Sequence, residues 1–128
     1  MLRPVLISCL LAGPVAAQEV EILPGYSDFR QPETRVVHRP VSLFEDWMSG
    51  FPESGEGAPS LDLSAGFEGD RLVMVLTLGG GGDDSVSAVQ RRIEFIQVEN
   101  LSWAVMAYGF RQTCHRGVAD GWTAEPCP

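Results

Sequence analysis

The sequence contains no lysine, and each of its nine basic residues is an arginine. Lysine forms the Schiff bases of covalent carbonyl chemistry and holds the phosphates in P-loop nucleotide sites, so both kinds of site are excluded. Basic charge as a whole is scarce, because seventeen acidic residues bring the formal net charge to −8 at pH 7. Nucleic acids and anionic membranes are bound through basic patches, and the charge balance argues against both as partners.

Side chains that serve catalysis or bind metals are also few. The two histidines, His38 and His115, lack the close spacing of a zinc site. Cys114 beside His115 has the composition of a thiol and its base, but neighbouring residues on a strand point to opposite faces. No serine stands in a G-x-S-x-G nucleophile elbow. The sequence therefore predicts no cofactor and no catalytic residue, and a hydrolytic enzyme that uses His115 or acidic residues stays as an alternative.

Long apolar runs are missing except at the N-terminus. Residues 1–17 have a positive start at Arg3, an apolar middle and a small-residue end, Val15-Ala16-Ala17, which is the pattern of a secretory signal peptide. The segment is too short and too interrupted to span a membrane. We expect a protein of the periplasm or the extracellular space, without a membrane span. The alternative is a lipid anchor on Cys9.

Cysteine is rare, and its use fits an exported chain. Cys9 would leave with the signal peptide, so that Cys114 and Cys127 remain. Two cysteines in an exported protein most often form a disulfide bond. A bond between them would close a loop worth roughly 3 kcal/mol in the chain-entropy model.

The hydrophobic pattern predicts one α+β domain that is mainly β. Residues 18–60 form an extended N-terminal segment, in which Ser42 and Glu45 have the spacing of a capping box for a short helix over 42–49, and a flexible loop follows the helix. Residues 61–128 form a small antiparallel meander of about four strands, followed by a C-terminal tail held by the disulfide. Residues 86–98 suit either a strand or a helix, and Ile93, Phe95, Ile96 and Val98 favour the strand.

A glycine-rich segment, residues 79–87, lies between two of the expected strands. It fits the calcium-binding nonapeptide G-G-x-G-x-D-x-U-x, in which carbonyl oxygens and Asp83 or Asp84 would be the ligands. That pattern works by stacking of repeats, and the sequence holds a single copy. We therefore favour a flexible hairpin loop without a metal, with a calcium-responsive surface as the alternative.

The C-terminal tail carries the candidate binding residues. Arg111, His115, Arg116 and Trp122 lie near the expected disulfide, and they form a basic and aromatic group on an acidic protein. Such a group suits an anionic or aromatic ligand, or the carboxylates of a partner protein. The alternative is that Trp122 packs under the disulfide and the arginines pair with nearby acids. The sequence thus predicts an exported binding or accessory module without catalytic activity, whose ligand or protein partner and oligomeric state stay open.

Overall fold

The structure, a computed structural model, describes residues 19–52, 55, 57–81, 84–117 and 121–128. It is mainly β, with one short helix. The elements in chain order are β1 (Glu21–Ile22), β2 (Val36–Val37), α1 (Ser42–Ser49), β3 (Ser60–Glu68), β4 (Arg71–Gly79), β5 (Val86–Val98), the 3-10 turn η1 (Glu99–Leu101) and β6 (Ser102–Cys114). Within these ranges no helix is long and apolar enough to cross a membrane.

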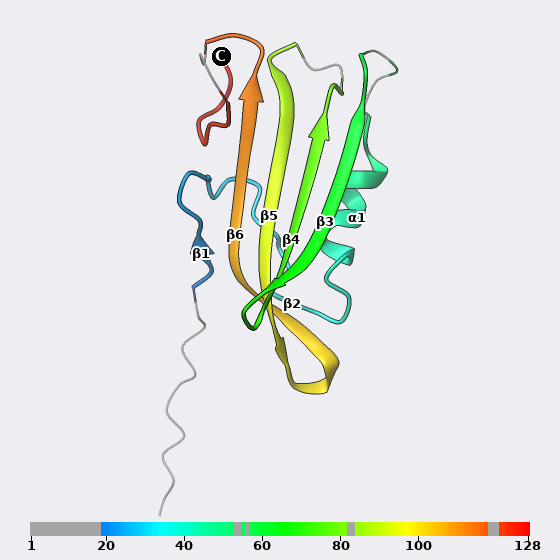
Figure 1. Cartoon of the computed structure of the whole chain (residues 1–128), viewed down its shortest axis with the longest axis vertical. Coiled ribbons are helices and arrows are strands. Elements are labelled where there is room, and N and C mark those ends of the chain that lie inside the picture. The colour runs from blue at the N-terminus through cyan, green and yellow to red at the C-terminus, as the bar shows by residue number, and fades with distance from the viewer. Residues whose placement is uncertain (1–18, 53–54, 56, 82–83, 118–120) are drawn as a thin grey trace, which may run out of the picture.

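The four long strands form the predicted antiparallel meander. They lie side by side in the order β6-β5-β4-β3 (Figure 1), and every neighbouring pair is antiparallel. Residues 86–98 form one continuous strand, β5, so the strand prediction is confirmed and the helix alternative is wrong. The glycine-rich segment connects β4 to β5, which confirms its place in a hairpin.

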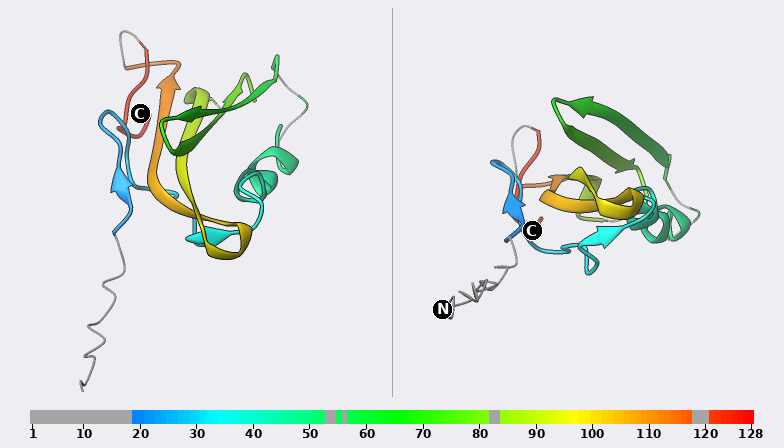
Figure 2. Two further views of the ribbon diagram at one scale, coloured as in Figure 1. Left: turned by 60° about the horizontal axis from the view of Figure 1, so that its bottom comes forward. Right: turned by 90° about the horizontal axis from the view of Figure 1, so that it is seen from below.

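The N-terminal segment joins the same sheet along the free edge of β6. β1 pairs in parallel with Ala107 and Tyr108, and β2 pairs antiparallel with Trp103 and Ala104. Two isolated bridges extend this cover, from Ser27 and Thr123 to the distal part of β6. Figure 2 shows β1 beside β6 in two further views. Short pieces from both ends of the chain thus pair the backbone of an edge that would otherwise be open to other strands.

One face of the sheet, which we call the inner face, carries the hydrophobic core. Phe44 of α1 is fully buried there, and Trp47 and Met48 of the same helix pack against the cluster. Val20, just before β1, also belongs to the buried cluster, and the strands supply its other buried side chains, Met74, Leu76, Leu78, Ile93, Phe95, Val105, Tyr108 and Phe110. The opposite face, the outer face, carries the polar residues of β5 such as Arg92 and Glu94.

Strict alternation along β6 is broken by a bulge. The sequence predicts Val105 on one face of this strand and Tyr108 and Phe110 on the other. In the structure the pairing shifts between Glu94 and Phe95 of β5, so that β6 contains one extra residue. Val105 therefore joins Tyr108 and Phe110 in the core, and the predicted separation is wrong.

The predicted helix over 42–49 is confirmed, but its capping box is wrong. Val41 is the N-cap residue and makes no side-chain cap. The Ser42 hydroxyl donates a hydrogen bond to the Arg39 carbonyl, 2.6 Å away, and Glu45 pairs with the Arg39 guanidinium at 2.7 Å. Arg39 thus takes both partners that the capping box would have used.

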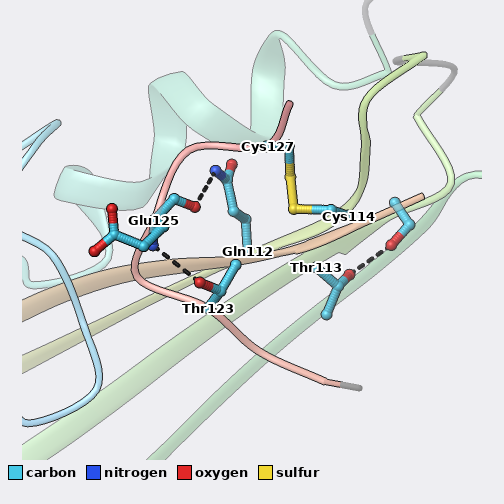
Figure 3. Close-up of a disulfide and its surroundings, with 7 residues drawn as sticks. Gln112, Thr113, Cys114, Thr123, Glu125 and Cys127 are labelled. Carbon is cyan, nitrogen blue, oxygen red and sulfur yellow. Dashed lines mark hydrogen bonds between the residues drawn. A yellow bond between two sulfur atoms is a disulfide. The ribbon is translucent and has the colours of Figure 1, made fainter. Parts of the chain in front are cut away.

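The disulfide between Cys114 and Cys127 is present, as predicted. It fastens the C-terminal tail to the end of β6 (Figure 3). Thr123 makes two backbone hydrogen bonds with Gln112, and the Gln112 amide donates to the Glu125 carbonyl at 3.0 Å. The tail is therefore held by backbone pairing as well as by the covalent bond.

Candidate binding cavity on the inner face

A cavity of about 460 Å³ opens between α1 and the inner face of the sheet. Trp47 of α1 and Phe51, just after the end of the helix, lie in one wall, and Leu78 of β4 and Val89 of β5 lie in the other. The lining is about half apolar and half polar. Its charged lining residues are Arg30, Asp46 and Arg91.

Arg91 stands in a row of apolar side chains. Along β5 the inner face receives Val89, Arg91, Ile93 and Phe95, because strand side chains alternate between faces. Arg91 lies opposite Leu76 on β4 and opposite Phe110 on β6, and both of these residues belong to the core. The strand therefore places a guanidinium where its pattern otherwise calls for an apolar residue.

The Arg91 side chain is buried without a carboxylate partner. The residue is 4% exposed, and its Nε atom has no hydrogen-bond partner. Within the described ranges none of the ion pairs involves Arg91. The guanidinium carbon lies 4.2 Å from the centroid of the Trp47 ring and 5.1 Å from that of Phe110. Aromatic rings on two sides thus take the place of a counter-ion.

Burial is the main cause of an altered acidity at this position. Desolvation lowers the pKa of the Arg91 guanidinium to about 10, and the positive charge of Arg30 acts in the same direction. Interaction with the Tyr108 hydroxyl opposes the change. That hydroxyl donates its own hydrogen bond to the Arg30 carbonyl oxygen. At neutral pH Arg91 is still protonated, so the cavity wall contains a buried positive charge.

On the outer face, in contrast, Arg71 and Arg92 pair with carboxylates. Glu94, 7% exposed, accepts hydrogen bonds from Arg71 and Arg92, each at 3.0 Å. Arg92 also pairs with Glu68 at 2.9 Å. The hydrogen bond with Glu94 is the main cause that raises the pKa of Arg71. Arg91 and its sequence neighbour Arg92 therefore differ sharply, since only Arg92 is neutralised by carboxylates.

The structure brings together two of the four candidate residues predicted in the tail. The Arg111 guanidinium lies 5.0 Å from the Trp122 ring and 4.6 Å from the Tyr26 ring. Its Nε donates to the Gln90 side chain at 2.7 Å. Arg111 is thus occupied by partners within the chain. His115 and Arg116 are exposed and follow the end of β6, and neither of them lines the cavity.

The predicted calcium alternative gains no further ligands from the fold. Asp83 lies outside the described residues, and Asp84 is exposed beside the glycines. Across the part of the chain that the structure describes, no three acidic, histidine or cysteine side chains gather where they could hold a metal ion.

Sequence reasoning missed Arg91, although a signal was present. If residues 89–95 form a strand, Val89, Ile93 and Phe95 share one face, and Arg91 is the one charged residue in that otherwise apolar row. The open choice between strand and helix hid this break, because a helix would not place Arg91 in line with Val89 and Ile93. Trp47, 44 residues earlier in the chain, could not be linked to Arg91 without the fold.

Comparisons of the chain with protein-family models, with curated proteins and with solved structures find no match. Function is therefore inferred from the geometry of the chain itself.

Proposed function

We propose that this protein is an exported binding module that holds a small ligand with a large apolar part in the cavity on its inner face. The observation that carries the proposal is the cavity of about 460 Å³ between α1 and the sheet, with Trp47, Phe51, Leu78 and Val89 in its walls. Small-molecule sites are concave and mostly apolar, and they contain a few polar groups that orient the ligand. The volume lies within the range of about 300 to 1,000 Å³ of such sites.

The fold supports a rigid site rather than one formed on loops. Most of the lining residues come from α1, β4, β5 and β6, and β4 and β5 lie in the middle of the four-strand meander; Arg30, Phe51 and Gly81 line the cavity from connecting segments. Sites built on such elements hold their side chains more precisely than loops do. Export is part of the proposal, since the disulfide is typical of oxidising compartments and residues 1–17 have the pattern of a signal peptide.

Binding is favoured over hydrolysis by where the potential catalytic groups lie. His115 is exposed and is not among the cavity residues. His38 meets a hydroxyl, that of Ser102 at 3.0 Å, but Ser102 is buried and does not line the cavity. A nucleophile and its base must reach a substrate in a common cleft. The charged groups of the cavity itself, Arg30, Asp46 and Arg91, suit recognition of a ligand.

The test is a titration of the purified, oxidised protein with N-phenyl-1-naphthylamine, an uncharged dye that fluoresces in apolar surroundings. We expect a saturable rise in fluorescence. Val89→Trp should weaken it, because Val89 lines the cavity. Val75→Trp is the matched control, since Val75 lies on the outer face of β4, pairs with Arg92 and is equally half-buried. The proposal fails if the dye does not saturate the unaltered protein, or if the two variants bind it equally well.

A further inference from the structure

Arg91 is a buried cation whose charge is not neutralised by a carboxylate within the described part of the chain. A buried charge is costly unless it is paired and hydrogen-bonded. In this chain the guanidinium has two aromatic neighbours, Trp47 and Phe110, but its Nε is unpaired and none of the described carboxylates forms an ion pair with it. Contacts with aromatic rings replace only part of the solvation that a charge loses on burial. An arginine kept at such a position points to a counter-ion that the chain does not supply.

We propose that the counter-ion is the carboxylate of the ligand, so that the cavity selects small apolar molecules with a single carboxylate group, which binds to Arg91. The inference rests on the proposed function, because it names the class of ligand for the same cavity. The planar guanidinium matches the geometry of a carboxylate, and arginine is the residue of choice for such pairs in sites shielded from water.

The charges of the lining favour a monoanion. Arg30 and Arg91 contribute two positive charges, and Asp46 contributes one negative charge. One carboxylate neutralises the remaining positive charge, whereas a doubly charged phosphate would leave an excess beside Asp46. Arg30 is exposed, and its guanidinium lies 5.1 Å from the Phe110 ring that also contacts Arg91. It therefore adds positive charge close to the buried guanidinium and can attract an anion on its way in.

The remaining walls suit an apolar chain or ring. Trp47 contacts the Arg91 guanidinium directly, and Leu78 and Val89 continue the same surface along the strands. A ligand whose carboxylate reaches Arg91 thus has its hydrocarbon part beside these side chains. Binding removes apolar surface from water on both partners, which adds to the charge interaction.

The experiment is displacement of bound N-phenyl-1-naphthylamine by three molecules with the same ten-carbon chain: decanoate, decanol and decyl phosphate. A charge-assisted hydrogen bond contributes about 1.5 to 3 kcal/mol, so decanoate should displace the dye at concentrations roughly 10- to 100-fold lower than decanol. Arg91→Met should remove this difference between decanoate and decanol. Arg92→Met is the matched control, because Arg92 is the next residue but lies on the outer face with its own carboxylate partners.

The outcomes separate the two proposals. If the dye binds but decanoate is no better than decanol, the carboxylate inference is wrong and the proposed function stands. Decyl phosphate that displaces the dye better than decanoate overturns the preference for a monoanion. If Arg91→Met keeps the difference between decanoate and decanol, the charge is recognised elsewhere and the role of Arg91 is refuted. If the dye does not bind to the unaltered protein, the proposed function itself is refuted. The comparison of decanoate with decanol uses the unaltered protein, so it remains decisive even if the variant does not fold.

Discussion

At the scale of single residues, Arg91 is the only buried arginine among the described residues, and none of their carboxylates forms an ion pair with it. Arg71 and Arg92 share Glu94 on the outer face, and Arg39 pairs with Glu45 beside α1. Arg91 is more deeply buried than any of these, and its partners are the rings of Trp47 and Phe110 and the Tyr108 hydroxyl instead of a carboxylate. A group that serves a ligand can lower the stability of the empty protein, since binding sites are often locally unfavourable.

The first prediction concerns the stability of the empty protein. Arg91→Met should raise the free energy of unfolding by on the order of 1 to 3 kcal/mol, because a buried, unpaired charge is replaced by an apolar side chain of similar length. Urea unfolding at pH 7 measures the change. Arg92→Met should lower the free energy of unfolding by about 1 kcal/mol, because Glu94 loses one of its two partners. A loss of stability in Arg91→Met would contradict the account and make Arg91 a structural residue.

The pH dependence of this effect has a defined sign. Burial lowers the pKa of Arg91 to about 10 in the folded protein, whereas the unfolded chain keeps its ordinary, higher pKa. Above pH 10 the folded state gives up this proton before the unfolded state does, so the cost of burial falls as the pH rises through that value. Below pH 10 both states are protonated and the full cost is present. The stability difference between Arg91→Met and the unaltered protein should therefore be constant from pH 6 to pH 9.

At the scale of secondary-structure elements, the hairpin between β4 and β5 depends on the backbone of one glycine. Gly80 has a φ of 64°, and a Cβ atom at this position would lie 2.2 Å from the carbonyl oxygen of Ala58. Gly69, in the turn between β3 and β4, has a φ of 62° but has no neighbouring atom within 4 Å of a Cβ. The two glycines thus share a backbone conformation and differ in their surroundings.

This difference gives the second prediction. Gly69→Ala should cost about 1 to 2 kcal/mol of stability, which is the cost of the left-handed conformation for a residue with a side chain. Gly80→Ala should cost a further 1 to 3 kcal/mol or so, because the backbone at Ala58 must also move. Thermal unfolding of the two variants measures the difference directly. Equal losses would show that the hairpin does not pack against the segment before β3.

The third prediction concerns the clasp at the end of β6. Cys114 and Cys127 are 13 residues apart in the sequence, and the loop that they close is worth roughly 3 kcal/mol in the chain-entropy model. Replacement of both cysteines by serine should lower the free energy of unfolding by about 2 to 3 kcal/mol. Thr123 and Gln112 keep their backbone pairing, so far-ultraviolet circular dichroism should keep its β signal below the new melting temperature. Unchanged stability would mean that the backbone pairing alone holds the tail.

Most of the secondary-structure elements, but not all of their local details, could be predicted from the sequence. The helix and the four long strands could be predicted, because local hydrophobic periodicity and turn residues indicate them. Two local details could not. The capping box failed because Arg39 lies close enough to bind both Ser42 and Glu45. The faces of β6 were assigned wrongly because the strand contains a bulge. The bulge arises from the pairing of β6 with β5, so it cannot be predicted from the sequence of β6 alone.

At the scale of the whole molecule, two short strands from the N-terminal segment cover an edge of the sheet formed by residues far along the chain. β1 and β2 reach β6, about 70 to 90 residues later, and β6 is therefore paired on both sides. The segment from β2 to α1 also brings Trp47 to the inner face, where it meets Arg91. The sequence predicted an extended N-terminal segment and a short helix, but not which face the helix covers. The cavity depends on that choice, so the candidate site could not be found from the sequence.

The charge of the whole molecule agrees with a selective cavity. A formal net charge of −8 repels anions at long range, so an anionic ligand gains from a local positive charge and from burial of its apolar part. The exposed Arg30 and the buried Arg91 supply that local charge at the cavity. Arg111 of β6 lies on the outer face near Tyr26, Gln90 and Trp122, and it is a second site at which binding of the same ligand can be tested.

The most direct test of the central claim is to record the arginine Nε–Hε signals by nuclear magnetic resonance while decanoate is added. Arg91→Lys identifies the Arg91 signal by its disappearance. The account predicts that this signal moves in a saturable manner, that Arg30 follows with a smaller change, and that Arg71 and Arg92 on the outer face stay in place. If the signal of Arg111 moves while that of Arg91 does not, the ligand binds at the tail surface and the account of the inner-face cavity is contradicted.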